Sequence, residues 1–149
     1  MSSYLVTGCA RGIGLCLAQL ISARPQNQVS YVFATARKPS EELEKLADDH
    51  KGRVVIVPLD QWDKASIERR VQIVEEKLGG RGLDVLINSA GVSSGSGADG
   101  MPNGADIGGI VQMNDLMSTL AVNVEGVHNV TRAFLPLLAK GTTRKVLNM

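Results

Sequence analysis

The residues with the clearest potential for chemistry are three glycines near the N-terminus, Gly8, Gly12 and Gly14, which follow a short apolar run and open an amphipathic segment. A glycine turn lets the backbone approach a pyrophosphate, and N–H groups at a helix start supply donors to the anion. Glycine can serve in such a turn for backbone geometry alone. A strand before the turn, a helix after it and a second strand at the expected distance favour a dinucleotide site that includes Gly8, Gly12, Ile13 and Gly14.

The elements that must position this turn alternate between two hydrophobic patterns. Short β-rich runs alternate with segments whose apolar residues recur at helical spacing, which is typical of an α/β domain. The expected strands lie at 4–7, 29–36, 53–59, 83–89 and 144–149, and the expected helices at 12–23, from 40, from 63 to 78 and at 114–140. We expect Ser40 and Asp63 to cap two of these helices.

The expected fold class is α/β, a Rossmann-type doubly wound parallel sheet that is incomplete, with its first five strands in the order 3-2-1-4-5. Residues 1–149 are treated as one domain. Right-handed crossovers place the first two helices on one face of the sheet and the next two on the other. Strands four and five then lack a cover on the first face, and strand five is an unpaired edge. We therefore expect the isolated chain to be poorly stable or to need a partner.

Composition excludes several classes of function. The formal net charge is +1, and one Trp, two Tyr and two Phe are too few for a base-stacking platform, so nucleic acid is not an expected partner. No basic leader or long apolar run points to a membrane, and we expect a cytoplasmic protein. Cys9 and Cys16 are expected to be reduced, and His50 and His128 offer no metal-ligand cluster.

Three motifs in order resemble the short-chain dehydrogenase/reductase family. They are the glycine turn at 7–14, Asn88-Ser89-Ala90-Gly91 after the fourth strand, and Asn123-Val124-Glu125-Gly126 in the long helix. The stretch 120–138 is most similar to the carbonyl-reductase members, and Ser89 departs from the Asn or Ala that the family most often carries. The resemblance implies an oxidoreductase that transfers hydride between a nicotinamide cofactor and a carbonyl or alcohol substrate.

The end of the second strand favours NADP over NAD. NAD-binding Rossmann domains place an acid there for the ribose 2′-hydroxyl, whereas this chain has Arg37 and Lys38. A guanidinium can pair with a 2′-phosphate, and Arg11 matches a position where NADP-preferring relatives often carry a base. Two solvated arginines are the alternative. By resemblance, Asp60 hydrogen-bonds the adenine amino group, with the start of a turn as its alternative role.

The same resemblance assigns two further parts of the site. Asn88, Ala90 and Gly91 pass beside the adenine ribose and stabilise the sheet, or simply end a strand. Asn123 interrupts the apolar face of the long helix, where a buried amide needs partners. In the family this residue belongs to the catalytic tetrad and holds a water in a proton relay. An incidental buried amide is the alternative. Trp62 is expected to pack near the turn after the third strand.

The family's catalytic Ser and Tyr-x-x-x-Lys do not occur in these 149 residues. We therefore expect the chain alone to bind NADP without catalysing carbonyl reduction, because it lacks the general acid. A non-catalytic NADP-binding module and a methyltransferase on a related sheet remain alternatives. The expected partner is a small-molecule substrate, and any homo-oligomer is expected to form through the long helix at 114–140. The glycine-rich stretch at 93–109 is expected to be a flexible loop, either bordering the substrate cleft or on the surface.

Overall fold

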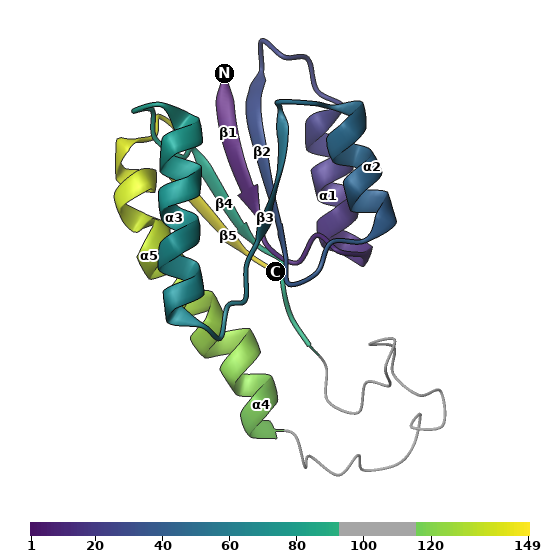
Figure 1. Cartoon of the computed structure of the whole chain (residues 1–149). Helices are drawn as coiled ribbons and strands as arrows, with labels where there is room; N and C mark the ends of the chain where they lie inside the picture. Colours follow the sequence, from purple (N-terminus) through teal and green to yellow (C-terminus); the bar gives the residue numbers. More distant parts are fainter. Residues whose placement is uncertain (93–115) are drawn as a thin grey trace.

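A computed structural model describes residues 1–92 and 116–149 of the chain, and Figure 1 follows its elements in sequence order. The expected loop at 93–109 lies outside the described residues. All strands in the described part belong to one parallel sheet in the order β3-β2-β1-β4-β5, which confirms the predicted fold. The strands are β1 (Ser2–Val6), β2 (Val29–Ala36), β3 (Val54–Pro58), β4 (Val85–Asn88) and β5 (Lys145–Asn148).

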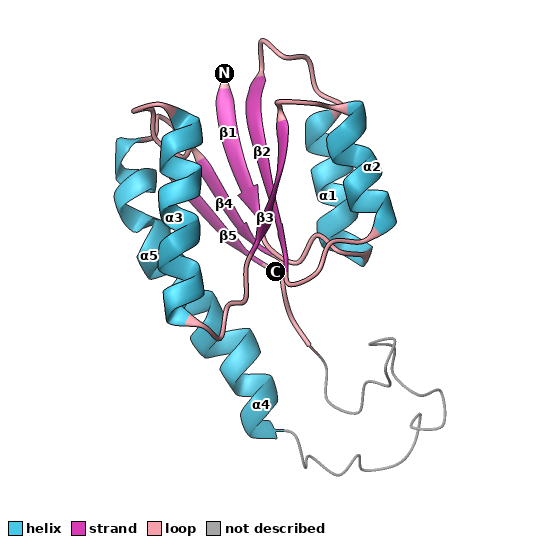
Figure 2. Ribbon diagram, in the orientation of Figure 1, coloured by secondary structure: helices cyan, strands magenta, loops and turns pink. Residues whose placement is uncertain are grey.

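Helices cover the two faces of the sheet as the crossover rule predicts. Figure 2 shows α1 (Gly12–Ser22) and α2 (Glu41–Asp49) on one side and α3 (Lys64–Leu78) and α5 (Val127–Lys140) on the other. Consecutive residues of a strand point to opposite faces. Accordingly Val32 packs in the cluster beneath α1 and α2, while Phe33 joins Phe134 beneath α3 and α5. Each face of the central strands therefore has its own apolar core.

Local capping explains where two of these helices begin. The Ser40 side chain accepts a hydrogen bond from the Leu43 amide at 3.3 Å, which confirms the predicted N-cap of α2. Asp63 occupies the N-cap position of α3 but makes no side-chain cap bond, so its expected capping role is wrong. Its carboxylate lies 3.6 Å from the Arg69 guanidinium instead.

The long helix differs from the continuous α-helix that we expected. Its described part consists of α4 (Leu116–Leu120), a π-helix η2 (Ala121–Gly126) and α5. A π-helix widens the turn by bonding residues five apart, and such segments occur frequently at functional sites. In Figure 1 the α4 end of this helix extends beyond the end of the sheet, whereas α5 packs against it. The widening falls at the junction between the packed and the protruding parts.

Strand β5 is the exposed edge that the strand order requires. It pairs only with β4 within the described residues, and Val146 and Leu147 are 40% and 45% exposed. The expectation that β4 also lacks a cover is wrong, because Val85 and Ile87 are only 5% and 6% exposed. These two side chains belong to the same apolar cluster as Ala18 of α1, so the helices on this face cover β4 as well as the strands before it.

Asp84 ties the amino-terminal ends of three strands together. One carboxylate oxygen accepts hydrogen bonds from the Ser3 amide at 2.8 Å and the Ser3 hydroxyl at 3.2 Å. The other accepts from the amides of Thr142 at 2.8 Å and Thr143 at 3.1 Å. Burial raises the pKa of the Asp84 carboxyl, but these hydrogen bonds outweigh it and hold the pKa below its ordinary value. The carboxylate fixes β1 and the turn before β5 to β4.

Candidate functional site

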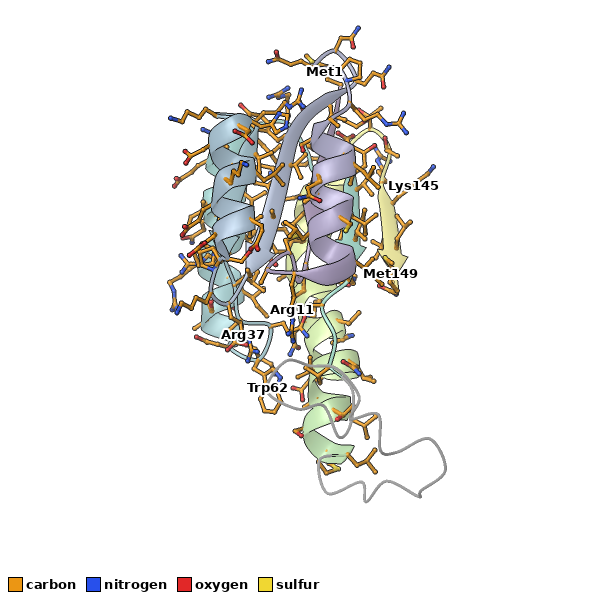
Figure 3. The ribbon with its side chains drawn as sticks, turned by 90° about the vertical axis from the view of Figure 1, so that its right-hand side faces the viewer. Met1, Arg11, Arg37, Trp62, Lys145 and Met149 are labelled. Carbon is orange, nitrogen blue, oxygen red and sulfur yellow. The ribbon has the colours of Figure 1, made fainter. Side chains whose placement is uncertain are left out.

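The predicted site residues gather at the carboxyl ends of the strands. Because all strands are parallel, the segments that follow β1, β2, β3 and β4 leave the sheet at one edge. Figure 3 shows Arg11, Arg37 and Trp62, from three of these segments, at this end of the molecule. In open α/β sheets ligands bind outside the carboxyl ends of the strands, where the strand order changes direction. The change occurs here between β1 and β4, next to the glycine turn.

The glycine turn needs its glycines for close approach. Gly8 has φ +74°, and a Cβ there would come within 2.7 Å of the Ala90 Cα. A Cβ at Gly14 would collide with the carbonyl of Gly8. Gly12 differs, because its φ is +59° but an added Cβ meets no described atom within 4 Å. The turn is therefore closed at Gly8 against the segment after β4 and open at Gly12, where a ligand can approach the backbone.

Hydrogen bonds hold the turn rigid from both sides. The buried Thr7 hydroxyl accepts from the amides of Ser89 and Ala90, each at 3.0 Å. On the other side the Cys9 amide donates to the Thr35 carbonyl at 2.8 Å. Burial raises the pKa of the Cys9 thiol to about 12, so the thiol is neutral and adds no charge near a phosphate. The turn is thus fixed before a ligand binds.

The start of α1 has the polarity that an anion requires. Arg11 is extended at the N-cap position and makes no side-chain cap bond, and the first turn of the helix carries no acid. The amide groups of a helix start carry a partial positive charge. Gly12, Ile13 and Gly14 supply this first turn, and Gly12 and Ile13 are exposed. The geometry fits a phosphate group at this position.

The segments after β2 and β3 bring the other predicted cofactor contacts to the same edge. Arg37 is exposed directly after β2, and no acidic residue ends that strand. After β3, an Asp60 carboxylate oxygen accepts from the Trp62 amide at 3.0 Å, so the turn role that we weighed for Asp60 exists in the structure. Trp62 is 54% exposed, and the expectation that it packs is wrong. Gln61 takes the buried position in this turn instead, at 8% exposure.

The end of β4 and the segment after it have two roles: Asn88 stabilises the sheet, and the residues after it are accessible to a ligand. Asn88 is 2% exposed, and its side-chain amide donates to the Thr131 hydroxyl and to the side-chain oxygen of Asn148, each at 2.9 Å. The Asn88 side chain therefore joins β4 to α5 and β5 and stabilises the sheet. Ala90 is partly exposed and Gly91 exposed, so their backbone is what this segment presents at the edge.

Asn123 makes the hydrogen bonds that its chemistry demands, but in a different environment from the expected one. Its side-chain amide donates to the Val92 carbonyl at 2.8 Å, and its oxygen accepts from the Val92 amide at 2.9 Å. The expected burial is wrong, because Asn123 is exposed among the described residues. It lies in η2, the element that joins α5 to α4, and α4 extends beyond the sheet in Figure 1. Both ends of its amide thus serve to hold the segment after β4.

Two residues of this site carried no signal that sequence reasoning used. Gln61 has a polar side chain next to Asp60, with nothing local to show that it is buried. Val92 contributes only backbone atoms. A hollow of about 150 Å³ lies at the opposite edge of the sheet, beside Ser3 and Asp84 and away from the glycine turn.

The described ranges contain neither a cluster of metal-ligating side chains nor a helix that could span a membrane. In residues 1–92 and 116–149, no three His, Cys, Asp or Glu side chains are grouped as metal ligands would be. No helix in those ranges is both long enough and apolar enough to cross a bilayer.

Comparison with known proteins places the chain in a family. The family model for short chain dehydrogenases matches residues 3–149. A short-chain dehydrogenase/reductase, AacuF, from Aspergillus aculeatus is 34% identical over 149 residues, which cover all of this chain and 54% of that protein. The 3-ketodihydrosphingosine reductase of Bacteroides thetaiotaomicron is also 34% identical, with 97% of this chain and 45% of the relative covered. The chain belongs to the short-chain dehydrogenase family, which confirms the resemblance.

Solved structures agree with this assignment. NADPH-bound carbonyl reductase from chicken fatty liver superposes with a TM-score of 0.75 and 37% identity, covering 94% of this chain and 49% of that one. Carbonyl reductase Sniffer of Drosophila melanogaster gives 0.77 and 32%, covering 94% and 53%. The chain spans about half the length of the relatives it matches. Family membership favours a nicotinamide-dependent oxidoreductase over the methyltransferase alternative.

Proposed function

We propose that residues 1–149 form the NADP-binding portion of an oxidoreductase that transfers hydride between nicotinamide and a carbonyl or alcohol substrate. The observation that carries the proposal is the rigid glycine turn, which is open at Gly12 and faces the same edge as Arg37. The proposal includes a small-molecule substrate and a cytoplasmic location. It assigns no role to nucleic acid or to a membrane.

Each predicted contact has a distinct part in this function. The first turn of α1 binds the pyrophosphate through Gly12, Ile13 and Gly14, while Gly8 allows the turn to approach Ala90. Arg11 and Arg37 recognise the 2′-phosphate, and Asp60 contacts the adenine amino group. The segment of Ala90 and Gly91 passes beside the ribose. When bound, the cofactor supplies the hydride at its nicotinamide ring.

Asn123 contributes from η2. Because both ends of its side-chain amide bond the backbone of Val92, it fixes the segment that leads away from β4. The proposed tetrad role requires this turn of the helix to hold a water for a proton relay. Because the Asn123 side chain is already hydrogen-bonded to Val92, we propose that a backbone atom of η2, rather than the side-chain amide, binds this water.

Calorimetric titration with NADPH and NADH tests the cofactor preference. A charge-assisted hydrogen bond contributes about 1.5 to 3 kcal/mol, so NADPH should bind roughly ten- to more than a hundredfold more tightly than NADH. Arg37→Asp should remove or reverse the preference. Arg24→Asp is the matched control, because Arg24 is an exposed arginine that follows α1 at the far end of the helix. Equal affinities of the unmutated chain for the two cofactors would refute the proposed NADP preference.

The second part of the proposal is that these residues alone do not catalyse carbonyl reduction. The two tyrosines lie in β1 and β2, and Tyr31 packs against the Phe33 ring at 5.7 Å and under the Arg81 guanidinium at 5.5 Å. Neither tyrosine belongs to a Tyr-x-x-x-Lys sequence. NADPH oxidation with reactive aldehydes and quinones should therefore remain at the rate without protein. Turnover by the 149 residues would show that another group here donates the proton.

The absence of a Tyr-x-x-x-Lys sequence from these 149 residues also favours one alternative function, a non-catalytic NADP-binding module that acts through a partner. The coding sequence downstream of Met149 distinguishes the two. A Ser followed by Tyr-x-x-x-Lys supports the oxidoreductase, and their absence supports the binding module. Both alternatives require NADPH binding at the glycine turn.

A further inference from the structure

Gln61 connects the segment after β3 to the π-helix. Its side chain is 8% exposed, and Nε2 donates a hydrogen bond to the Val122 carbonyl oxygen at 2.9 Å. The two residues are far apart in sequence, and Val122 directly precedes Asn123. Val122 lies within η2, and a side chain that bonds into the backbone ladder of a helix is a recognised cause of local irregularity.

Gly126 makes the room for this contact. It is the last residue of η2 and is buried. A Cβ at this position would lie 2.8 Å from Gln61 Cγ and 2.9 Å from Cδ, closer than real side chains pack. The Gln61 side chain therefore lies directly over Gly126 while its amide reaches the Val122 carbonyl. The Gln61 side chain therefore packs on the last residue of η2 and donates a hydrogen bond near its first residue.

The widened turn also carries Asn123, whose amide bonds both backbone groups of Val92. Val122 and Asn123 are consecutive, so a change in the path of the helix at one alters the direction of the other. Two long-range contacts of η2 thus meet within two residues. One reaches the turn that contains Asp60, and the other reaches the segment after Gly91.

We propose that Gln61 is a positioning residue that holds η2 in the path that keeps the Asn123 amide on the Val92 backbone. Gln61 thereby couples the turn after β3, assigned to adenine in the proposed function, to the segment after β4, assigned there to the ribose. This consequence for the cofactor rests on the proposed function, whereas the coupling between Gln61 and Val92 does not. The coupling can be measured without cofactor.

Hydrogen exchange at the Val92 amide is the direct measurement. Gln61→Met keeps the length of the side chain but removes the donor. Because a hydrogen bond contributes a net stabilisation of modest size, the protection of the Val92 amide should fall about two- to tenfold. Gln72→Met is the matched control, because Gln72 is an exposed glutamine on α3. An unchanged Val92 amide in Gln61→Met would overturn the proposal.

Gln61→Glu separates hydrogen bonding from space filling. An ionised Glu would place a second acceptor against the Val122 carbonyl, whereas a protonated Glu can donate to it. Protection of Val92, relative to the unmutated chain at the same pH, should therefore be low near neutral pH and recover on acidification. A side chain that only fills space would show no such recovery, and this result would overturn the proposal.

Gly126→Ala offers a variant that leaves Gln61 unchanged. The new methyl group displaces the Gln61 side chain, so protection of Val92 should fall as it does in Gln61→Met. The effect should vanish when Gln61 is already alanine, because the collision partner is gone. An equal effect in both backgrounds would overturn the proposal. Absence of NADPH binding to the unmutated chain would refute the proposed function and leave these results intact.

Discussion

Replacing the Asp84 carboxylate should destabilise the whole chain, because this group joins three strand ends. In Asp84→Asn, one oxygen can still accept from Thr142 and Thr143. The new amide nitrogen then faces the Ser3 amide, and two donors oppose each other. Ser3 is 1% exposed, so water cannot replace the lost acceptor.

The expected loss follows from these contacts. A buried donor without an acceptor costs about 1 to 3 kcal/mol, and the remaining bonds lose their charge assistance. We expect Asp84→Asn to lower the free energy of unfolding by about 2 to 4 kcal/mol, a large part of the 5 to 15 kcal/mol typical of a domain. Urea denaturation followed by circular dichroism measures it, with Asp49→Asn as the control because Asp49 is exposed at the end of α2.

The pH dependence provides a second check on the same carboxylate. Hydrogen bonding lowers the folded-state pKa of Asp84 below its ordinary value of 3.8. The stabilisation is therefore complete above that value and is lost as the pH falls through the lower folded-state pKa. The stability difference between the unmutated chain and Asp84→Asn should shrink below about pH 4. A difference under about 0.5 kcal/mol at neutral pH, as for an ordinary surface substitution, would refute the structural role.

Three further outcomes are expected. Gly14→Ala should abolish NADPH binding and lower stability, because its methyl group collides with the Gly8 carbonyl. Calorimetry measures the binding and thermal unfolding measures the stability. Binding as tight as that of the unmutated chain would contradict the proposed site. Iodoacetamide at neutral pH should modify Cys16, which is exposed, and spare Cys9, whose buried thiol has a pKa raised to about 12; mass spectrometry would reveal a second adduct if Cys9 were reactive. NADPH should quench the fluorescence of Trp62, the single tryptophan, because it is exposed at the same edge as Arg37, and an unchanged emission at saturating NADPH would place the cofactor elsewhere.

Much of the fold could be predicted because it depends on local patterns. Alternation between strand and helix periodicity defined the elements, the doubly wound Rossmann pattern then gave the strand order, and the handedness of the crossovers gave the face that each helix covers. The glycine turn was also readable, since strand, turn and helix follow each other directly. Ser40 illustrates the same point at smaller scale, because a cap depends only on the next few residues. The sequence alone therefore determined the α/β class, the strand order and the position of the glycine turn.

The tertiary structure decided which side chains support the site, because their partners are distant in sequence. Asn123 meets Val92 across 31 residues, Gln61 meets Val122 across 61, and Ser3 meets Asp84 across 81. Periodicity assigns a residue to a face of its element but does not identify the backbone group opposite it. For that reason Asn123 was expected to be buried and Gln61 was overlooked. Only the packing of η2 against the segments after β3 and β4 revealed their contacts.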